Sequence, residues 1–158
     1  MTDDRRPTAD DRVPDSSGRS AMTYKFQQLE IYKLALDYID LIYALAGKLP
    51  KSEDFNLKSQ ITRAATSIAL NIAEGSTSQS DAEQSRFLGM ALRSLIETVA
   101  CQDVIERRKY ASIDDLRVSR DLGSKLFAKV QAMKRFLSHS QTNQELSANR
   151  SSVVRRRS

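Results

Sequence analysis

Residues 26–50, FQQLEIYKLALDYIDLIYALAGKLP, carry the pattern that decides the fold class. Apolar side chains recur there at alternating spacings of three and four residues, in two neighbouring rows. The first row is Leu29, Tyr32, Leu36, Ile39 and Tyr43, and the second is Ile31, Ala35, Tyr38, Ile42 and Leu45. Two adjacent rows make an apolar stripe wider than the seam of a two-stranded coiled coil. The segment predicts a helix from about Phe26 to Lys48, which ends before Pro50 because proline disfavours the α conformation in the residue preceding it.

A second helix is predicted over residues 53–74, and it is poor in charge. Between Phe55 and Ala73 the only charged residues are Lys58 and Arg63. Its core rows are Leu57, Ile61, Ala64, Ala65, Ile68, Ile72 and Ala73. A helix with so few charges is expected to be buried on most sides, either inside a bundle or against another subunit.

Cap and stop residues mark the remaining helix ends. Gly75 is predicted to end the second helix in the left-handed conformation. Ser80 begins a capping box at the start of a third helix, which extends to about Arg108. Ser112 caps a fourth helix, which ends near Leu137. The residues predicted to face inside are, on the third helix, Phe87, Leu88, Ala91, Leu92, Leu95, Val99, Gln102 and Ile105, and on the fourth, Leu122, Leu126, Val130, Met133 and Leu137.

Four amphipathic helices joined by short loops pack most simply as an up-down-up-down four-helix bundle, so the predicted fold class is all-α. The 158 residues include five Gly and three Pro, and Pro50 is the only strong helix breaker after residue 15. A β-sandwich or barrel would need a turn every ~8–12 residues, so an all-β fold is excluded.

Charge divides the chain into three parts. Residues 1–23 carry four Arg and five Asp with few apolar side chains, and we predict a disordered tail. Residues 24–137 hold 17 basic and 14 acidic residues and form the predicted bundle. Residues 138–158 carry four Arg against one Glu and are predicted to be a basic disordered tail. More than half of the net charge of +5 therefore lies in this last segment.

The side chains that most enzymes need are scarce. The one cysteine, Cys101, cannot form an internal disulfide or build a thiolate metal site alone, and the one histidine, His139, lies past the predicted helices. No glycine-rich phosphate loop and no nucleophile elbow occurs. We therefore predict no catalytic residue, no metal and no cofactor. Without a membrane-spanning apolar run or a secretory apolar segment, the protein is expected to be cytoplasmic and free of membrane contact.

Three polar residues interrupt the charge-poor second helix: Arg63, Asn71 and Glu74. A buried arginine needs a partner carboxylate, for which Glu97 is a candidate. We interpret these residues as a polar network that fixes bundle register or a subunit contact. Direct contact with a ligand is the alternative.

Cations dominate the polar face of the fourth helix and the end of the chain. The nucleic-acid-binding candidates are Arg117, Arg120, Lys125, Lys129, Lys134, Arg135, Arg155, Arg156 and Arg157. An excess of one charge sign favours contact with phosphates, although a solvated charged face is the simpler reading. The face has no interleaved aromatic residues, so base stacking is not expected there.

Three blocks of the sequence carry a resemblance to a known family: LPKSEDF (49–55), RAATSIALNIAEGS (63–76) and RFLGMALRSL (86–95). In this order they resemble the small four-helix-bundle proteins encoded in intervening sequences of large-subunit ribosomal RNA genes. The resemblance spans about residues 24–137. The family is also similar to the accessory variability determinant of diversity-generating retroelements, which binds a reverse transcriptase and its RNA.

The resemblance implies a homopentamer with a basic surface that contacts nucleic acid. It also implies structural roles for Arg63, Asn71, Glu74 and Gly75, which match the family's motif. The chain departs from the family at three places. Ala69 replaces a usual proline, Ser78 and Gln79 replace a basic pair, and Gln84 replaces a common phenylalanine.

Two function hypotheses follow. The first is a non-catalytic homo-oligomer that acts as an accessory protein and associates with RNA or DNA. The second is a protein-binding assembly module or adaptor for a larger enzyme, such as a reverse transcriptase, without direct nucleic-acid contact.

Overall fold

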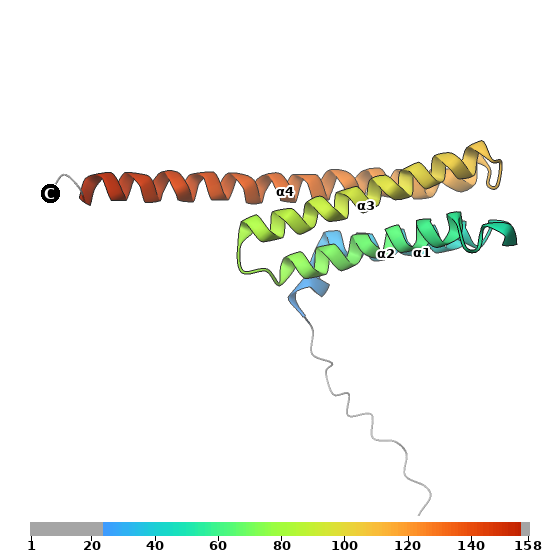
Figure 1. The fold of residues 1–158 in the computed structure, drawn as a ribbon, viewed down its shortest axis with the longest axis horizontal. Coiled ribbons are helices and arrows are strands. Elements are labelled where there is room, and N and C mark those ends of the chain that lie inside the picture. The colour runs from blue at the N-terminus through green and yellow to red at the C-terminus, as the bar shows by residue number, and fades with distance from the viewer. Residues whose placement is uncertain (1–23, 156–158) are drawn as a thin grey trace, which may run out of the picture.

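Helices make up the architecture of this protein, seen here in a computed structural model (Figure 1). The α-helices are α1 (Glu30–Ala46), α2 (Leu57–Ser76), α3 (Asp81–Arg107) and α4 (Ile113–Arg155), and the short 3-10 helices η1 (Lys25–Gln28) and η2 (Lys51–Glu53) precede α1 and α2. The structure describes the backbone of residues 24–155 and the side chains of residues 24–152. The predicted N-terminal tail, 1–23, lies outside the described residues. Within the described part there is no strand, which confirms the all-α prediction.

The four α-helices pack antiparallel to their chain neighbours. Helix α1 contacts α2 and α4, and α3 contacts the same two helices, so α1 and α3 lie diagonally across the bundle. The α1–α2 connection and the α3–α4 turn lie at the same end (Figure 1). This is the predicted up-down-up-down arrangement. None of the helices in residues 24–155 is long and apolar enough to cross a membrane.

The two apolar rows of α1 have different environments. The row Ile31, Ala35, Tyr38, Ile42 and Leu45 is buried, whereas the first row is only partly covered. Leu36 is 42% exposed and Tyr43 is 53% exposed. A bundle helix directs one row into the core and leaves the flanking row at the rim. The core row is thus the second of the two.

The structure corrects the prediction at the C-terminal end. Residues 138–155, predicted as part of a disordered tail, continue α4 as helix. Leu137 is the last buried residue in the part of the chain whose side chains are described. The helix continues because each added residue of a growing helix gains a backbone hydrogen bond, and no Gly or Pro follows Gly123. In Figure 1, α4 projects well beyond the other helices.

Gly75 does not end α2 as predicted. The helix continues to Ser76, and among the described residues no glycine has a positive φ. The reason for glycine here is a close approach: a Cβ on Gly75 would lie 2.9 Å from the Cβ of Phe87 on α3. The residue with a left-handed conformation is instead Lys109, just after α3, with a φ of 59°. The amide of the next residue, Tyr110, donates a hydrogen bond to the carbonyl of Ile105, which is typical of a helix C-terminus.

The predicted N-caps of α3 and α4 are present. The Ser80 hydroxyl accepts a hydrogen bond from the Glu83 amide at 3.2 Å. The Ser112 hydroxyl accepts from the Asp115 amide at 3.1 Å, and the Asp115 carboxylate accepts from the Ser112 amide at the same distance. These reciprocal bonds satisfy amides that the first turn of a helix leaves without backbone partners.

Candidate nucleic-acid interface

Three of the six predicted cations on α4 form ion pairs within the protein. Arg117 pairs with Asp114 at 2.7 Å, one turn earlier on the same helix. Lys129 pairs with Glu30 of α1 at 3.0 Å. The guanidinium of Arg120 forms ion pairs with two carboxylates of α3, Asp103 at 2.9 Å and Glu106 at 2.7 Å. A cation that is already paired has less to gain from a phosphate.

The Arg120 guanidinium is the most strongly held of these groups. Its side chain is 30% exposed, and its hydrogen bond to Glu106, followed by the one to Asp103, raises the pKa of Arg120. Because the two carboxylates lie one turn apart on α3, one guanidinium ties α4 to two positions of that helix. Arg120 therefore fixes the α3–α4 pairing.

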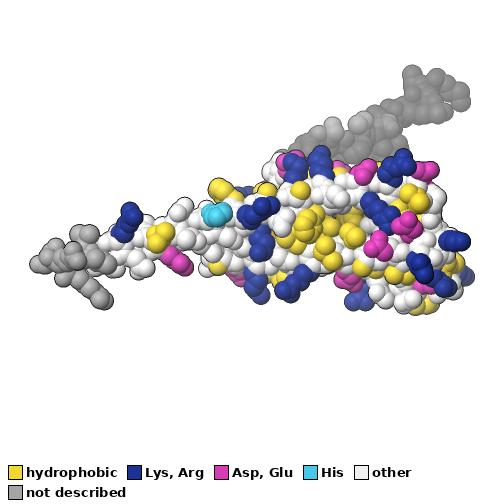
Figure 2. All heavy atoms as spheres, turned by 90° about the horizontal axis from the view of Figure 1, so that it is seen from above, with side chains coloured by type: hydrophobic (Ala, Val, Ile, Leu, Met, Phe, Trp, Pro, Cys, Tyr) yellow, Lys and Arg dark blue, Asp and Glu magenta, His cyan; other side chains and the backbone are white. Residues whose placement is uncertain are grey.

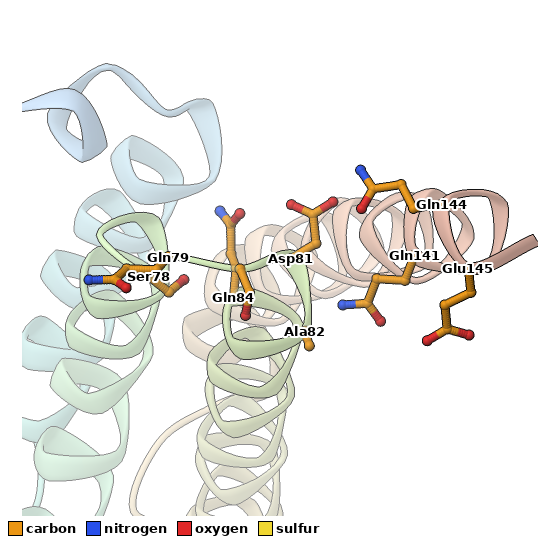
Figure 3. Close-up of a pocket in the computed structure, with 9 residues that line it drawn as sticks. Ser78, Gln79, Asp81, Ala82, Gln84, Gln141, Gln144 and Glu145 are labelled. Atoms are coloured by element: carbon orange, nitrogen blue, oxygen red, sulfur yellow. The ribbon is translucent and has the colours of Figure 1, made fainter. Parts of the chain in front are cut away.

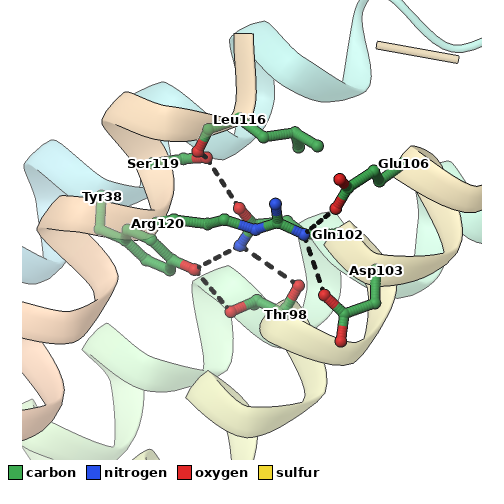
Figure 4. A network of polar contacts seen from close by, with 8 residues as sticks. All are labelled: Tyr38, Thr98, Gln102, Asp103, Glu106, Leu116, Ser119 and Arg120. Carbon is green, nitrogen blue, oxygen red and sulfur yellow. Dashed lines mark hydrogen bonds and ion pairs between the residues drawn. The ribbon is translucent and has the colours of Figure 1, made fainter. Parts of the chain in front are cut away.

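A buried polar network lies on the inner side of the same helix pair (Figure 4). The Gln102 amide donates to the Tyr38 hydroxyl at 3.0 Å, and its carbonyl accepts from the Ser119 hydroxyl at 2.8 Å. The Tyr38 hydroxyl also lies 2.7 Å from that of Thr98. Burial raises the pKa of Tyr38, which keeps its hydroxyl protonated and available to this network. The network joins α1, α3 and α4, and sets the rotation of α4.

Lys125, Lys134 and Arg135 are the predicted cations of α4 for which the described residues provide no ion pair. Lys125 and Arg135 are exposed, whereas Lys134 is half-buried and its Cε lies against Gly89. At about 100° per residue these three side chains spread around the outer half of the helix rather than forming one row. Figure 2 shows one face of the molecule, on which Lys and Arg side chains surround an apolar area.

The helical extension of α4 adds cations at lower density. Between residues 122 and 155, α4 carries six Lys and Arg against the single acid Glu145. Arg150 is exposed on the extension, whereas the side chain of Arg155 and the whole of Arg156 and Arg157 lie outside what the structure describes. The extension is thus a single helix with an excess of positive charge.

The polar residues of α2 are not brought together as one network. Asn71 is buried and donates to the carbonyl and the hydroxyl of Ser67, at 2.8 and 3.0 Å. Arg63 and Glu74 are exposed. The expectation of a buried Arg63 is therefore wrong: a side chain at the edge of the α2–α3 groove reaches water without a carboxylate partner. Arg63 and Glu97 do line one groove there, with a volume of about 340 Å³.

The α2–α3 loop borders a cavity of about 500 Å³ against the α4 extension (Figure 3). Its lining residues are Ser78, Gln79, Ser80, Asp81, Ala82, Gln84, Gln141, Gln144 and Glu145. The lining contains two carboxylates and no cation. Such a surface repels phosphate, so this loop does not replace the basic pair that the resemblance implies.

Sequence reasoning missed a basic segment in the α3–α4 turn. Arg107, Arg108 and Lys109 are consecutive and all exposed. The three residues are adjacent in the sequence, but they lie at a helix end rather than on one face of a helix. A prediction based on the periodicity of helical faces therefore does not identify them. Cys101, by contrast, is buried, and burial raises the pKa of its thiol, so it is unreactive.

The comparisons with known proteins agree with this architecture. Residues 27–139 match the model of the 23S rRNA-intervening sequence protein family. The chain belongs to this family. The match ends close to Leu137, so the family's shared part is the packed bundle rather than the α4 extension.

A solved structure has the same fold. It is a crystal structure of a protein of unknown function from the S23 ribosomal protein family of Bacteroides thetaiotaomicron. The two chains are 23% identical with a TM-score of 0.62, and the match covers 66% of this chain and 97% of that one. No curated protein matches the chain.

Proposed function

We propose that this chain is a non-catalytic, oligomeric accessory protein that associates with RNA through α4. One observation carries the proposal: from residue 122 to its end at Arg155, α4 has six cations against one acid and extends past the bundle. A helix with this imbalance attracts a polyanion and releases counterions on binding. The family's name, which refers to ribosomal RNA, points to the same class of partner.

Three cations support the proposal on the bundle itself. On the part of α4 that packs in the bundle, Lys125, Lys134 and Arg135 have no ion pair to a described residue, so they gain most from a phosphate. Their spread around the helix suits a curved or folded RNA better than a single straight backbone. The nucleic-acid contact is therefore expected to depend on RNA shape and on salt.

Filter binding to a structured RNA over a salt series tests this proposal. The triple variant Lys125→Gln, Lys134→Gln, Arg135→Gln should weaken binding and lower the slope of log affinity against log salt by about two. Arg117→Gln is the matched control, because Arg117 is already paired with Asp114. Absent or salt-independent binding by the unmodified protein at low salt would contradict the proposal.

We also propose that α1 and α2 form the surface for self-association. Leu36 and Tyr43 lie seven residues apart on one side of α1 and are exposed, and Leu70 on the neighbouring α2 is 57% exposed. Only Lys58 and Arg63 carry charge between Phe55 and Ala73. Exposed apolar residues on two neighbouring helices, one of which is poor in charge, are typical of a subunit interface.

Light scattering at tens of micromolar tests the oligomer, for which the resemblance implies five copies. Leu70→Glu should shift the mass to that of the monomer, while Arg93→Gln, at an exposed position of α3 outside this surface, should not. A monomeric unmodified protein would refute self-association.

The same face supports the second hypothesis, a protein-binding module. Its partner would be a larger enzyme, of which a reverse transcriptase is the class that the family resemblance implies. Recovery of one protein partner in a pull-down after nuclease treatment, abolished by Leu70→Glu, would favour this hypothesis over RNA association.

A further inference from the structure

An exposed basic cluster lies in the α3–α4 turn, at one end of the bundle and outside α4. Arg107, Arg108 and Lys109 follow one another in the chain, and all three are exposed. The structure shows no ion pair to any of them among residues 24–152. Three adjacent cations in three residues are denser than any segment of α4.

The carboxylates near this turn already have partners. Glu106 and Asp103 contact Arg120, at 2.7 and 2.9 Å. The Glu53 carboxylate accepts from the Tyr110 hydroxyl at 3.1 Å and from the Asn56 amide at 3.0 Å. The carboxylates of Asp103 and Glu106 thus face Arg120, whereas Glu53 lies beside the turn and is bound through Tyr110.

The turn is also held in one conformation. Lys109 has a φ of 59°, and the Tyr110 amide donates to the carbonyl of Ile105 at 3.0 Å. The Tyr110 hydroxyl ties the turn to Glu53 of η2, and the Arg108 guanidinium lies over the Tyr110 ring at 5.7 Å. The hydrogen bond from Arg108 to Tyr110 raises the pKa of Arg108. A turn whose backbone is already ordered loses less entropy when it binds an anion.

An exposed aromatic ring lies at the same end of the bundle, in the α1–α2 connection that the turn contacts through Tyr110 and Glu53. Phe55 follows Glu53 by two residues and its side chain is fully exposed, at 101%. A solvated phenyl ring offers a base two open faces for stacking. Cations and exposed aromatic rings together bind single-stranded nucleic acid, in which phosphates pair with cations and bases stack on aromatic side chains.

We propose that this end of the bundle binds a single-stranded segment of RNA. Arg107, Arg108 and Lys109 contact its phosphates and Phe55 stacks on a base. The inference rests on the proposed RNA association and adds a second site, at the opposite end of the bundle from the α4 extension. Cations at a helix C-terminus also stabilise the helix dipole, so the test must separate binding from folding.

Fluorescence anisotropy with a labelled 12-nucleotide oligouridine and with a blunt RNA duplex of the same length provides that test. The turn variant Arg107→Gln, Arg108→Gln, Lys109→Gly should lower affinity for the single strand about tenfold or more and reduce its salt slope by about two. Phe55→Ser should weaken single-strand binding by about tenfold with no change in the slope. Neither variant should alter the affinity for the duplex by more than about twofold.

Two further variants serve as controls. Lys33→Gln, Arg63→Gln, Arg93→Gln removes three exposed cations elsewhere and should leave the preference for the single strand unchanged. The α4 variant Lys125→Gln, Lys134→Gln, Arg135→Gln should weaken duplex binding more than single-strand binding. Circular dichroism melts confirm that each variant is folded, and Lys109→Gly favours folding at a positive φ.

The outcomes separate the two proposals. Suppose that the unmodified protein binds RNA, and that the turn variant and Phe55→Ser bind the single strand with the affinity of the unmodified protein. The second site is then overturned and the proposed function stands. If the unmodified protein binds neither RNA at low salt, both are overturned. Loss of single-strand binding in the charge-matched control would also overturn the site, because net charge alone would then explain it.

Discussion

The hydroxyl of Tyr38 on α1 lies 2.7 Å from the hydroxyl of Thr98 on α3, so a side-chain contact joins two helices that lie diagonally across the bundle. Both residues are fully buried. The ring of Tyr38 passes beside Gly123 of α4, where a Cβ would lie 3.0 Å from its Cε2 atom. The small residue on α4 therefore makes room for the ring that connects α1 with α3.

Tyr38→Phe tests how much this contact contributes. The variant keeps the ring but removes the hydroxyl that bonds Thr98 and Gln102, and it leaves buried polar groups with fewer partners. We expect the free energy of unfolding to fall by about 1–3 kcal/mol in urea denaturation. Tyr43→Phe, on the exposed side of the same helix, should change it by less than about 0.5 kcal/mol. Equal effects of the two substitutions would show that the network adds nothing specific.

Gly75→Ala probes the contact between α2 and α3. The new Cβ would lie 2.9 Å from the Cβ of Phe87, and a Cβ atom cannot move away without a backbone shift. We expect a loss of about 1–3 kcal/mol in the free energy of unfolding. Gly47→Ala is the control, because its Cβ would meet no heavy atom closer than 3.4 Å. A neutral Gly75→Ala would mean that α2 and α3 separate easily.

Asp115 makes stability depend on acid pH. Hydrogen bonds from Lys48, and then from Ser112, lower the pKa of Asp115 from 3.8 to about 2. Because the folded-state pKa is lower, the contribution of Asp115 is complete above about pH 4 and is lost as the pH falls towards 2. Asp115→Asn should therefore be less stable than the unmodified protein at pH 6, and the difference should shrink below pH 4.

Melting temperatures measured between pH 2 and pH 6 check this expectation. Asp114→Asn is the matched control, since Asp114 is 82% exposed and pairs only with Arg117 one turn away. The Asp114 variant should keep the pH dependence of the unmodified protein. An unchanged pH profile in Asp115→Asn would contradict the assignment.

The extension of α4 should be dispensable for folding. Beyond Leu137 most side chains are exposed, and packing against the bundle is limited to the polar cavity near Gln141. A chain that ends at residue 139 should unfold with a free energy within about 0.5 kcal/mol of the full chain. Its RNA affinity should fall, because Arg150 and the terminal arginines are removed. A large loss of stability would show that the extension packs on the bundle or on another copy.

The fold was predictable because its determinants are local. The period of the apolar residues in α1, the cap residues Ser80 and Ser112, and the break at Pro50 each depend on a few neighbouring residues. The helix boundaries were less accurate: α1 ends at Ala46 and α2 begins at Leu57, since the short helix η2 occupies the connection. The prediction for Gly75 was wrong because the role of this glycine depends on Phe87, which lies on another helix and approaches it only in the folded bundle.

The candidate site was less predictable than the fold. Sequence placed Arg117, Arg120 and Lys129 on a polar face, but it could not show that each has a carboxylate partner within 3.0 Å. Those partners come from α1, from α3 and from α4 itself. The free cations can be identified only when the neighbouring helices are in place.

By itself the sequence determined the four helices of the bundle, their topology and the excess of positive charge after Asp121, because these follow from residue type and local spacing. Tertiary structure decided which apolar row of α1 is buried, which cations remain unpaired, and that Tyr38 reaches Thr98 across the bundle. Those features depend on side chains from separate helices meeting in space, and the distances between them are not encoded in the spacing along any one helix.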